Sequence, residues 1–494
     1  MPQYDTIIRG GSVIDGTGAP ARTADVAVTG GRIAAVGAID GEAARVIDAA
    51  GLAVAPGFID VHSHDDVALL NVPALDFKAA QGVTTVVCGN CGAGAAPANE
   101  RSQQYFDRGV GGILGPVKEF TWHSLGEFYD AVRAAGPSVN AAFLVPHGAL
   151  RMHALGVENR PPSDAELASM KELLAAGMAA GAVGMSTGLI YAPGIFARTE
   201  ELIELNRVVA RYGGIYVSHI RNEGAGLLDA VREAIHIGEE AGTPVQVSHF
   251  KATGRDNWGM TEQSLALVEE ARARGVPVTV DMYPYAAGST ALAALAPRGR
   301  PVREVDPHDL LIASCKYQHQ YEGMRLDEVA LAMDLPLEDA TTRLLREEEN
   351  AVVIVHFTME EGDVRRVIQH PLCMVGSDGI PSPEGKPHPR LYGTFPRVLG
   401  RYARDEGLMT VEESVRKMTS FPAETFRLAE RGQVREGWWA DLVVFDIARV
   451  ADTATYEDPR RYPEGISHVL VNGELVVENG EPSNPPAGQV LVRG

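Results

Sequence analysis

The stretch GFIDVHSHDD, residues 57–66, places His62 and His64 one residue apart at the end of an apolar run. If a β-strand continues through them, both side chains point to the same face, because side chains alternate along a strand. Two imidazoles on one face can bind the same metal ion. A short motif of this kind arises readily by chance, so the metal interpretation depends on the rest of the chain.

Further residues that can bind a metal follow other apolar runs. Cys91 follows the second run, His219 and His249 end the fifth and sixth, and Asp378 ends the eighth. The carboxyl ends of parallel barrel strands share one rim, so these side chains are expected to converge. Imidazole and thiolate ligands together favour zinc over magnesium or calcium. The predicted zinc ligands are therefore His62, His64, Cys91, His219, His249 and Asp378.

The elements that must position these residues alternate between strand-like and helical segments. This alternation is typical of βα units around a buried parallel sheet, and eight runs predict an α/β fold with a TIM-like (β/α)8 barrel. A ninth run, AVVIVHF at 351–357, exceeds the count and is assigned to an inserted, lid-like excursion at about 286–357. The eight runs are GFIDVHSH, GVTTVVCGN, NAAFLVPHG, AVGMSTGL, GIYVSHI, PVQVSHF, VPVTVDMYPY and LCMVGSD.

Both ends of the chain consist of short β-patterned pieces with glycine-rich turns. Neither end has enough strands for a stable core, so the two are predicted to form one small β-sandwich. The expected parts are residues 1–55 and 430–494 for this sandwich and residues 56–429 for the barrel.

Composition restricts the partners. The 494 residues include 44 Lys and Arg against 65 Asp and Glu, a formal net charge of −21. This charge opposes binding to nucleic acid or to anionic lipid and favours a small-molecule partner. The sequence shows no secretory signal pattern and no apolar stretch long enough to span a membrane, so a soluble, cytoplasmic protein is expected. Four cysteines in a chain of this length do not indicate a disulfide framework.

The order His-x-His, His, His, Asp along a barrel with a split β-unit resembles the amidohydrolase superfamily. Finer motifs resemble the N-acyl-D-amino-acid deacylases (D-aminoacylases), and they occur in order over nearly the whole chain. This resemblance implies zinc-dependent hydrolysis of the amide bond of N-acyl-D-amino acids. The motifs are GNCG at 89–92, YVSHIRNEG at 216–224, VSHFKATG at 247–254, YPYAAGST at 283–290, GSDGIP at 376–381 and HPRLYGTFPRVLG at 388–400.

The resemblance also implies how the ligands are shared. It implies one tightly held zinc on Cys91, His219 and His249, and a second, weaker position near His62, His64 and Asp378. Many relatives bridge two metals with a carboxylated lysine on the fourth strand, but AVGMSTGL contains no lysine. The resemblance implies that Cys91 takes the bridging place instead.

The remaining roles concern the proton and the substrate. Asp378 is expected to act as general base and then general acid, because it lies beside the water that a zinc ion activates. Lys251 and Tyr283 are expected to hold the carbonyl oxygen or the carboxylate of the substrate. Arg390 has a planar fork suited to a carboxylate, and the family motif assigns it that role.

Two segments bear on specificity. After GNCG the family pattern leads us to expect a bulkier apolar residue, but the chain continues with AGAAP; the loop from Asp378 to Arg390 also departs from that pattern. The uncharged stretch AAGSTALAALAP at 286–297 is expected to form an apolar wall, and a hydrophobic substrate side chain is therefore expected.

Two other functions stay open from the sequence. A cyclic-amide hydrolase of the dihydroorotase or hydantoinase type would keep the metal, but the strand-4 lysine is missing. A catalytically silent scaffold that acts as a binding protein would be expected to lose metal ligands. Eight further histidines do not follow barrel strands and are predicted to be structural or solvent-exposed: His123, His153, His236, His308, His319, His356, His370 and His468.

Overall fold

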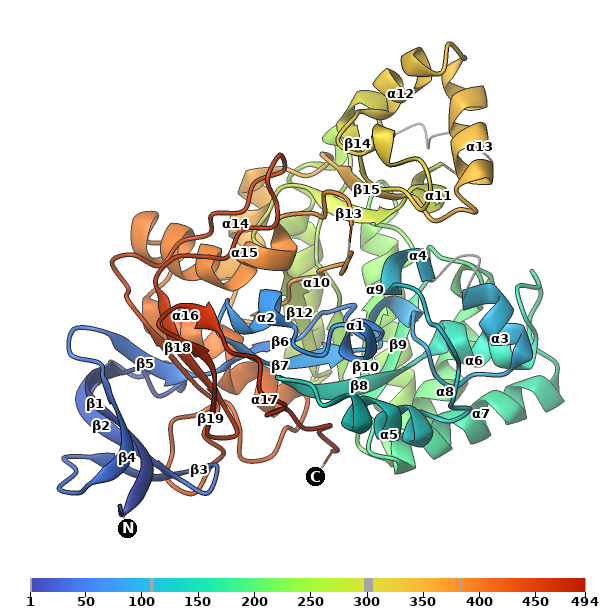
Figure 1. Ribbon diagram of the computed structural model, residues 1–494. Coiled ribbons are helices and arrows are strands. Elements are labelled where there is room, and N and C mark those ends of the chain that lie inside the picture. Colours follow the sequence, from blue (N-terminus) through green and yellow to red (C-terminus); the bar gives the residue numbers. More distant parts are fainter. Residues whose placement is uncertain (1, 107–110, 297–304, 383, 494) are drawn as a thin grey trace.

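The computed structural model describes residues 2–106, 111–296, 305–382 and 384–493. At its centre, eight parallel strands form one sheet in the order of the chain, and this sheet curves into a barrel (Figure 1). All of their residues are buried. The strands are β6 (Phe58–Asp60), β7 (Val83–Cys88), β8 (Asn140–Pro146), β9 (Gly184–Gly188), β10 (Ile215–His219), β11 (Val245–Val247), β12 (Val278–Met282) and β16 (Cys373–Val375).

The barrel closes between its first and last strands without a regular ladder in the described residues. A single bridge pairs Ser63 with Gly379, and the backbone N–H of Asp378 donates to the carbonyl of His62 at 2.7 Å. Both contacts lie just beyond the carboxyl ends of β6 and β16. Closure therefore joins the two segments that carry predicted ligands.

Helices surround the barrel and bury one face each, as α8 does through Leu202, Leu205 and Val209. Ser124 and Ser163 begin α5 and α7 by accepting hydrogen bonds from the backbone of the first turn. The helices are α1 (Ala68–Asn71), α2 (Asp76–Ala79), α3 (Glu100–Tyr105), α4 (Gly111–Leu114), α5 (Leu125–Ala135), α6 (His147–Ala154), α7 (Asp164–Ala179), α8 (Thr199–Arg211), α9 (Leu227–Ala241), α10 (Thr261–Ala273), α14 (Glu361–Gln369), α15 (Arg390–Arg397), α16 (Val411–Met418) and α17 (Ser420–Thr425), with a π-helical stretch at Val398–Asp405.

The two ends of the chain share one nine-stranded sheet, in which β5 pairs antiparallel with β17. Residues from both ends, including Ile8, Val28, Leu442 and Leu470, form its core. Figure 1 shows this sheet, blue and red, on one side of the barrel. Its strands are β1 (Tyr4–Val13), β2 (Arg22–Thr29), β3 (Arg32–Gly37), β4 (Ala43–Asp48), β5 (Ala53–Pro56), β17 (Leu442–Phe445), β18 (Ile466–Val471), β19 (Glu474–Glu478) and β20 (Glu481–Pro482).

A smaller unit is inserted between β12 and β16 and projects beyond the barrel (yellow in Figure 1). The ninth apolar run is its central strand, β15, which pairs antiparallel with β13 and β14. The unit has its own apolar core, which includes Leu310, Leu326 and Leu344. Its elements are β13 (Gly288–Ala291), α11 (Leu292–Leu295), β14 (Leu310–Ser314), α12 (Leu326–Ala332), α13 (Leu337–Glu347) and β15 (Val353–His356).

The structure confirms the predicted barrel and the β-unit built from both termini, while the predicted residue limits between these parts stay predictions. One local expectation is wrong. The first strand does not continue through His62 and His64, because β6 ends at Asp60. Among the described residues, no helix is both long and apolar enough to cross a membrane.

A buried ion cluster holds the closing strands in place. The Nζ of Lys78 on α2 contacts Asp60 Oδ2 at 2.6 Å, Ser377 Oγ at 2.8 Å and Asp65 Oδ2 at 3.3 Å. The side chains of Lys78, Asp60 and Asp65 are 0% exposed. Burial alone would lower the pKa of Lys78, but the two carboxylates raise it, so this lysine stays charged. The cluster ties the end of β6 to the segment after β16.

We expect Lys78→Met to lower the free energy of unfolding by about 3–5 kcal/mol, because it leaves two buried carboxylates without their cation. Urea unfolding followed by circular dichroism measures this change. Lys171→Met is the matched control, because Lys171 pairs with Glu204 while about one third of each side chain is exposed, and it should cost less than about 1 kcal/mol. Equal losses in the two variants would contradict a special role for the buried cluster.

Candidate metal centre and active site

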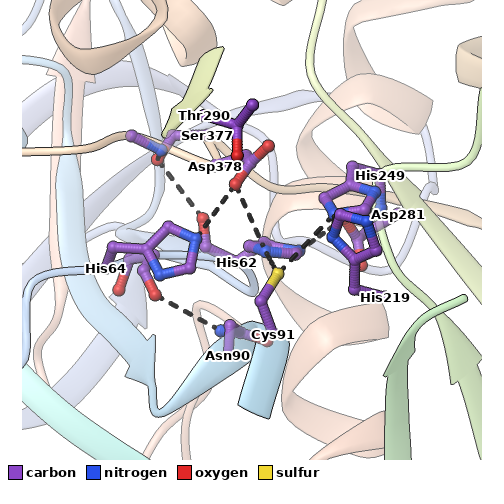
Figure 2. Close-up of polar contacts among 12 residues, drawn as sticks. His62, His64, Asn90, Cys91, His219, His249, Asp281, Thr290, Ser377 and Asp378 are labelled. Carbon is purple, nitrogen blue, oxygen red and sulfur yellow. Dashed lines mark hydrogen bonds and ion pairs between the residues drawn. The ribbon is translucent and has the colours of Figure 1, made fainter. Parts of the chain in front are cut away.

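The predicted ligands meet at the mouth of the barrel in two groups. One group is Cys91, His219 and His249, and the other is His62, His64, Cys91 and Asp378. Within each group the possible ligand atoms all lie within 4.8 Å of one another. Figure 2 shows the sulfur of Cys91 between the two groups.

Most of these residues lie just past a strand rather than in it. Only His219 is the last residue of its strand, while Cys91, His249 and Asp378 follow β7, β11 and β16 by two or three residues. These three have left-handed backbones, with φ of 55° at Cys91, 35° at His249 and 50° at Asp378. Such conformations are costly for residues other than glycine and occur where the surrounding structure enforces them. The sharp turns direct the side chains back over the barrel axis.

The fourth strand, β9, makes room for the Cys91 loop. A Cβ at Gly188 would lie 2.0 Å from the carbonyl oxygen of Cys91, so only glycine fits there. The Oγ of Ser186 accepts a hydrogen bond from the N–H of Gly92 at 3.0 Å and donates to the carbonyl of Gly89. β9 therefore packs against the loop that carries Cys91. It has no lysine side chain that could project into this place.

The two cysteines of the C-x-x-C sequence have opposite electrostatic surroundings. Burial alone would raise the pKa of Cys91, but the charge of His62 and hydrogen bonds from His219, His249 and His62 hold it well below its ordinary value. For Cys88, burial and the nearby Asp66 and Asp65 raise the pKa well above that value. Only Cys91 is thus set up as a thiolate, the form that binds metals.

Two carboxylates orient the histidines from behind. Asp281 Oδ1 lies 3.1 Å from His62 Nδ1 and accepts the backbone N–H of His249 at 2.8 Å. Glu223 Oε1 lies 3.0 Å from His249 Nδ1. Carboxylates in this position fix the orientation of metal-binding imidazoles. The sequence analysis missed both, although Glu223 stands four residues after His219, and Asp281 two residues before Tyr283.

Asp378 is surrounded by cationic groups. Its Oδ1 lies 3.1 Å from His64 Nε2, and its Oδ2 lies 2.9 Å from Arg390 Nη1. Burial alone would raise its pKa, but Arg390, His62, His249 and the hydrogen bond with His64 hold it well below the ordinary value. Asp378 is therefore ionised at neutral pH and can accept a proton.

The predicted substrate-binding residues lie beside this centre. Lys251 Nζ contacts Glu223 Oε1 at 2.7 Å and lies 5.8 Å from the ring centroid of Tyr283. The Tyr283 hydroxyl donates to the sulfur of Met359 at 3.3 Å. Arg390 stacks over the Tyr283 ring at 4.4 Å and is 1% exposed. Lys251 and Tyr283 line the cavity above the centre, whereas Arg390 faces Asp378 from behind it.

The donor set fits a zinc ion. The Cys91 sulfur lies 3.3 Å from His62 Nε2 and 3.6 Å from His249 Nε2, which is close to the roughly 3.5 Å expected between two ligands of one tetrahedral zinc. The ring nitrogens that face the other ligands are His64 Nε2, 3.1 Å from Asp378 Oδ1, and His219 Nδ1, 2.8 Å from His249 Nε2.

A cavity of about 1000 Å³ opens above the centre. Tyr191 lines it, with its hydroxyl 2.9 Å from Thr290 Oγ1 and its ring 4.9 Å from that of His219. His356, predicted to be structural or exposed, also lines the cavity while only 6% exposed. Burial and the charge of Lys251 lower its pKa to about 3, so this imidazole is neutral. The sequence analysis missed His356 because it belongs to the inserted unit rather than to a barrel strand.

Comparison with known proteins agrees with this geometry. A profile of the amidohydrolase family matches residues 45–477. D-aminoacylase of Alcaligenes xylosoxydans xylosoxydans is 42% identical over 492 residues, covering 99% of this chain and 98% of that protein. The crystal structure of N-acyl-D-glutamate deacylase from Bordetella bronchiseptica, with zinc and a phosphonate mimic of the tetrahedral intermediate, is 42% identical with a TM-score of 0.91 and covers 99% of both chains. A D-aminoacylase structure described by its binuclear metal center is 42% identical with a TM-score of 0.90, covering 99% of this chain and 100% of that one.

We expect Cys91→Ala to reduce bound zinc from close to one ion per chain to a small fraction, because it removes the ligand that both groups share. Elemental analysis of the purified protein measures this content. Cys88→Ala is the matched control, since Cys88 is equally buried in the same C-x-x-C sequence but lies in neither group, and it should keep its zinc. Full zinc content in Cys91→Ala, or equal loss in both variants, would contradict the assignment.

Proposed function

The chain belongs to the amidohydrolase family, and from this membership we propose that it is a zinc-dependent deacylase that hydrolyses N-acyl-D-amino acids. The observation that carries the proposal is the pair of ligand groups that share Cys91 at the barrel mouth. In the reaction the amide C–N bond breaks and one water is consumed. The acyl carbon gains a hydroxyl group and the nitrogen gains a proton, which releases a carboxylate and a free D-amino acid.

We propose one tight zinc site on Cys91, His219 and His249 and a weaker site near His62, His64 and Asp378. Both groups contain the Cys91 thiolate and two imidazoles, but the aspartate of the second group is already paired with Arg390, which supports a weaker site there. When bound, zinc lowers the pKa of a coordinated water to about 7 and polarises a carbonyl group.

Asp378 is the proposed proton carrier. Its ionised carboxylate lies at the edge of both ligand groups, where it can take a proton from the attacking water and pass it to the leaving nitrogen. Arg390 holds Asp378 in position through its contact at 2.9 Å. The predicted contact of Arg390 with the substrate carboxylate stays a prediction.

Lys251 is the proposed partner of the substrate carboxylate. Burial alone would lower its pKa, but Glu223 raises it, so the ammonium group stays charged in the cavity wall. Tyr283 forms the adjoining wall, packed against Met359 and Arg390. A charged, buried lysine can bind an anionic group with little competition from water.

We also propose a hydrophobic substrate side chain. Within the described residues, the uncharged segment predicted at 286–297 contributes Ser289, Thr290, Ala291, Ala293, Ala294 and Leu295 to the cavity lining, and only its last residue falls outside the description. The described part of this segment carries no charged residue, so an acidic side chain packed against it would lose its hydration without a cation there.

The two rival functions have weaker support. A cyclic-amide hydrolase would be expected to carry a lysine on β9, but this strand reads GMSTG. A D-hydantoinase of known structure shares only the fold with this chain, at 17% identity and a TM-score of 0.59. A silent scaffold has no need for a complete ligand set, and every predicted ligand is in place here.

A panel of substrates tests the proposed function. We expect kcat/KM for N-acetyl-D-leucine or N-acetyl-D-methionine to exceed that for N-acetyl-D-glutamate and N-acetyl-D-aspartate by at least about tenfold, because one unpaired buried charge costs more than about 1.4 kcal/mol. N-acetyl-L-leucine and hydantoin should be poor substrates, with released amine as the readout. The highest kcat/KM for the D-glutamate or D-aspartate derivative would contradict the apolar wall. The highest kcat/KM for N-acetyl-L-leucine or hydantoin would contradict the deacylase assignment.

We expect Asp378→Asn to lower kcat by about a hundredfold or more, the usual scale for the loss of a general acid–base group, while the tight zinc stays bound. The substitution keeps the shape of the side chain and removes its basicity. Asp452→Asn is the control, because Asp452 pairs with Arg397 at 2.8 Å outside the cavity lining, and it should change kcat less than threefold. Near-normal kcat in zinc-loaded Asp378→Asn would assign the proton transfer to another group.

A further inference from the structure

The cavity above the ligand groups is much larger than an N-acetyl amino acid. Its volume is about 1000 Å³, at the upper end of the range of pockets that enclose drug-sized molecules. An N-acetyl amino acid has only about a dozen non-hydrogen atoms, so it would leave most of this space empty. The distribution of residues around the cavity indicates what the remaining space can hold.

The cavity has two chemically different sides. Lys251 and Tyr283, which follow β11 and β12, mark a polar side. The second side is lined by residues from the segments after β7, β8 and β9. These are Ala93, Gly94, Ala95, Pro97, Ala98, Ser102, Phe106, Ile113 and Phe120 after β7, Gly148, Ala149 and Met152 after β8, and residues 190–196 after β9. Because β8 and β12 are four places apart in an eight-stranded barrel, the segments after these two strands lie on opposite sides of the barrel mouth. We call the second side the acyl lobe.

The acyl lobe is apolar. Among the described residues that line it, none carries a charge, and only Ser102 and Tyr191 have polar side-chain groups. Phe106 and Phe120 stack edge to face at 5.5 Å, and Met152 of α6 adds a third large apolar side chain. This wall can bury an aliphatic chain but offers little to a polar one.

Small residues leave the acyl lobe open next to the ligands. The segment after Cys91 reads GAGAAPA, and Ala93, Gly94, Ala95 and Ala98 line the cavity there. This is the stretch in which the family pattern led us to expect a bulkier residue. Its small side chains connect the ligand groups directly with the apolar space beyond them.

We propose that the acyl lobe binds a long aliphatic acyl chain, so that the substrates of this chain are N-acyl-D-amino acids whose acyl group has about eight carbons or more. The inference rests on the proposed deacylase function and adds the class of acyl group to it. A substrate whose carboxylate lies at Lys251 and whose amide carbonyl lies at the metal ligands extends its acyl group away from Lys251, into the acyl lobe. The products are then a fatty acid and a free D-amino acid.

Comparison of two substrates with the wild-type zinc enzyme tests the proposal. We expect kcat/KM for N-octanoyl-D-leucine to exceed that for N-acetyl-D-leucine by roughly a hundredfold. Each methylene group that the lobe buries raises kcat/KM roughly fourfold, and the octanoyl group has six more methylene groups than the acetyl group. Burial of about half of them is enough for this difference. Equal or faster turnover of the acetyl substrate would overturn the inference and leave the deacylase function standing. Failure to hydrolyse either substrate would overturn both.

A variant locates the effect in the acyl lobe. Ala149→Phe fills the lobe from α6 and should lower the octanoyl-to-acetyl ratio of kcat/KM at least tenfold. Ala134→Phe is the matched control, since Ala134 is exposed on α5 and lies outside the cavity lining, and its ratio should equal that of the wild type. An unchanged ratio in folded, zinc-loaded Ala149→Phe would overturn the placement of the chain in this lobe. Because the first comparison uses only wild-type protein, it decides the inference even if Ala149→Phe fails to fold.

Discussion

The closure of the barrel between its first and last strands is the constraint on which the rest of the site depends. In the described residues these two strands form no regular ladder, and the contact is made instead by Asp378 N–H with His62 and by the buried cluster of Lys78, Asp60 and Ser377. In this low-dielectric interior, these charge-assisted contacts are strong only while every member is present. These contacts place His62, His64 and Asp378 side by side. The conformational preferences of the two segments would not by themselves bring these residues together.

The centre concentrates charge where an apolar barrel would ordinarily exclude it. Cys91 and Asp378 are held as anions by the histidines and by Arg390, and Lys251 is held as a cation by Glu223. Each group therefore depends on a neighbour of opposite sign for the free energy that it loses on leaving water. The left-handed backbones of Cys91, His249 and Asp378 add local strain, which the closed barrel around them compensates.

Much of the fold follows from patterns that are local in the chain. The apolar runs predicted eight barrel strands in the correct order, because a parallel strand that is buried on both faces reads as a continuous apolar run. The β-patterned ends predicted a shared terminal unit. The ligand types were equally visible, since imidazole and thiolate at strand ends have few other uses in combination. The assumed strand through His62 and His64 was wrong because three buried residues suffice for β6, and the chain then turns toward Asp378.

Sequence alone thus determined the order of the elements, because apolar runs and their spacing are sufficient for it, and residue type and spacing predicted the candidate metal ligands. Tertiary structure alone decided which distant groups act on them. Glu223 from the loop after β10 and Asp281 from β12 support His249, and His356 reaches the cavity from the inserted unit. It also decided which of two similar cysteines is held as a thiolate, because folding places imidazoles and their hydrogen bonds beside Cys91 and carboxylates beside Cys88. The energies of these interactions fall off steeply with distance through space. Distance through space has no counterpart in the order of residues along the chain.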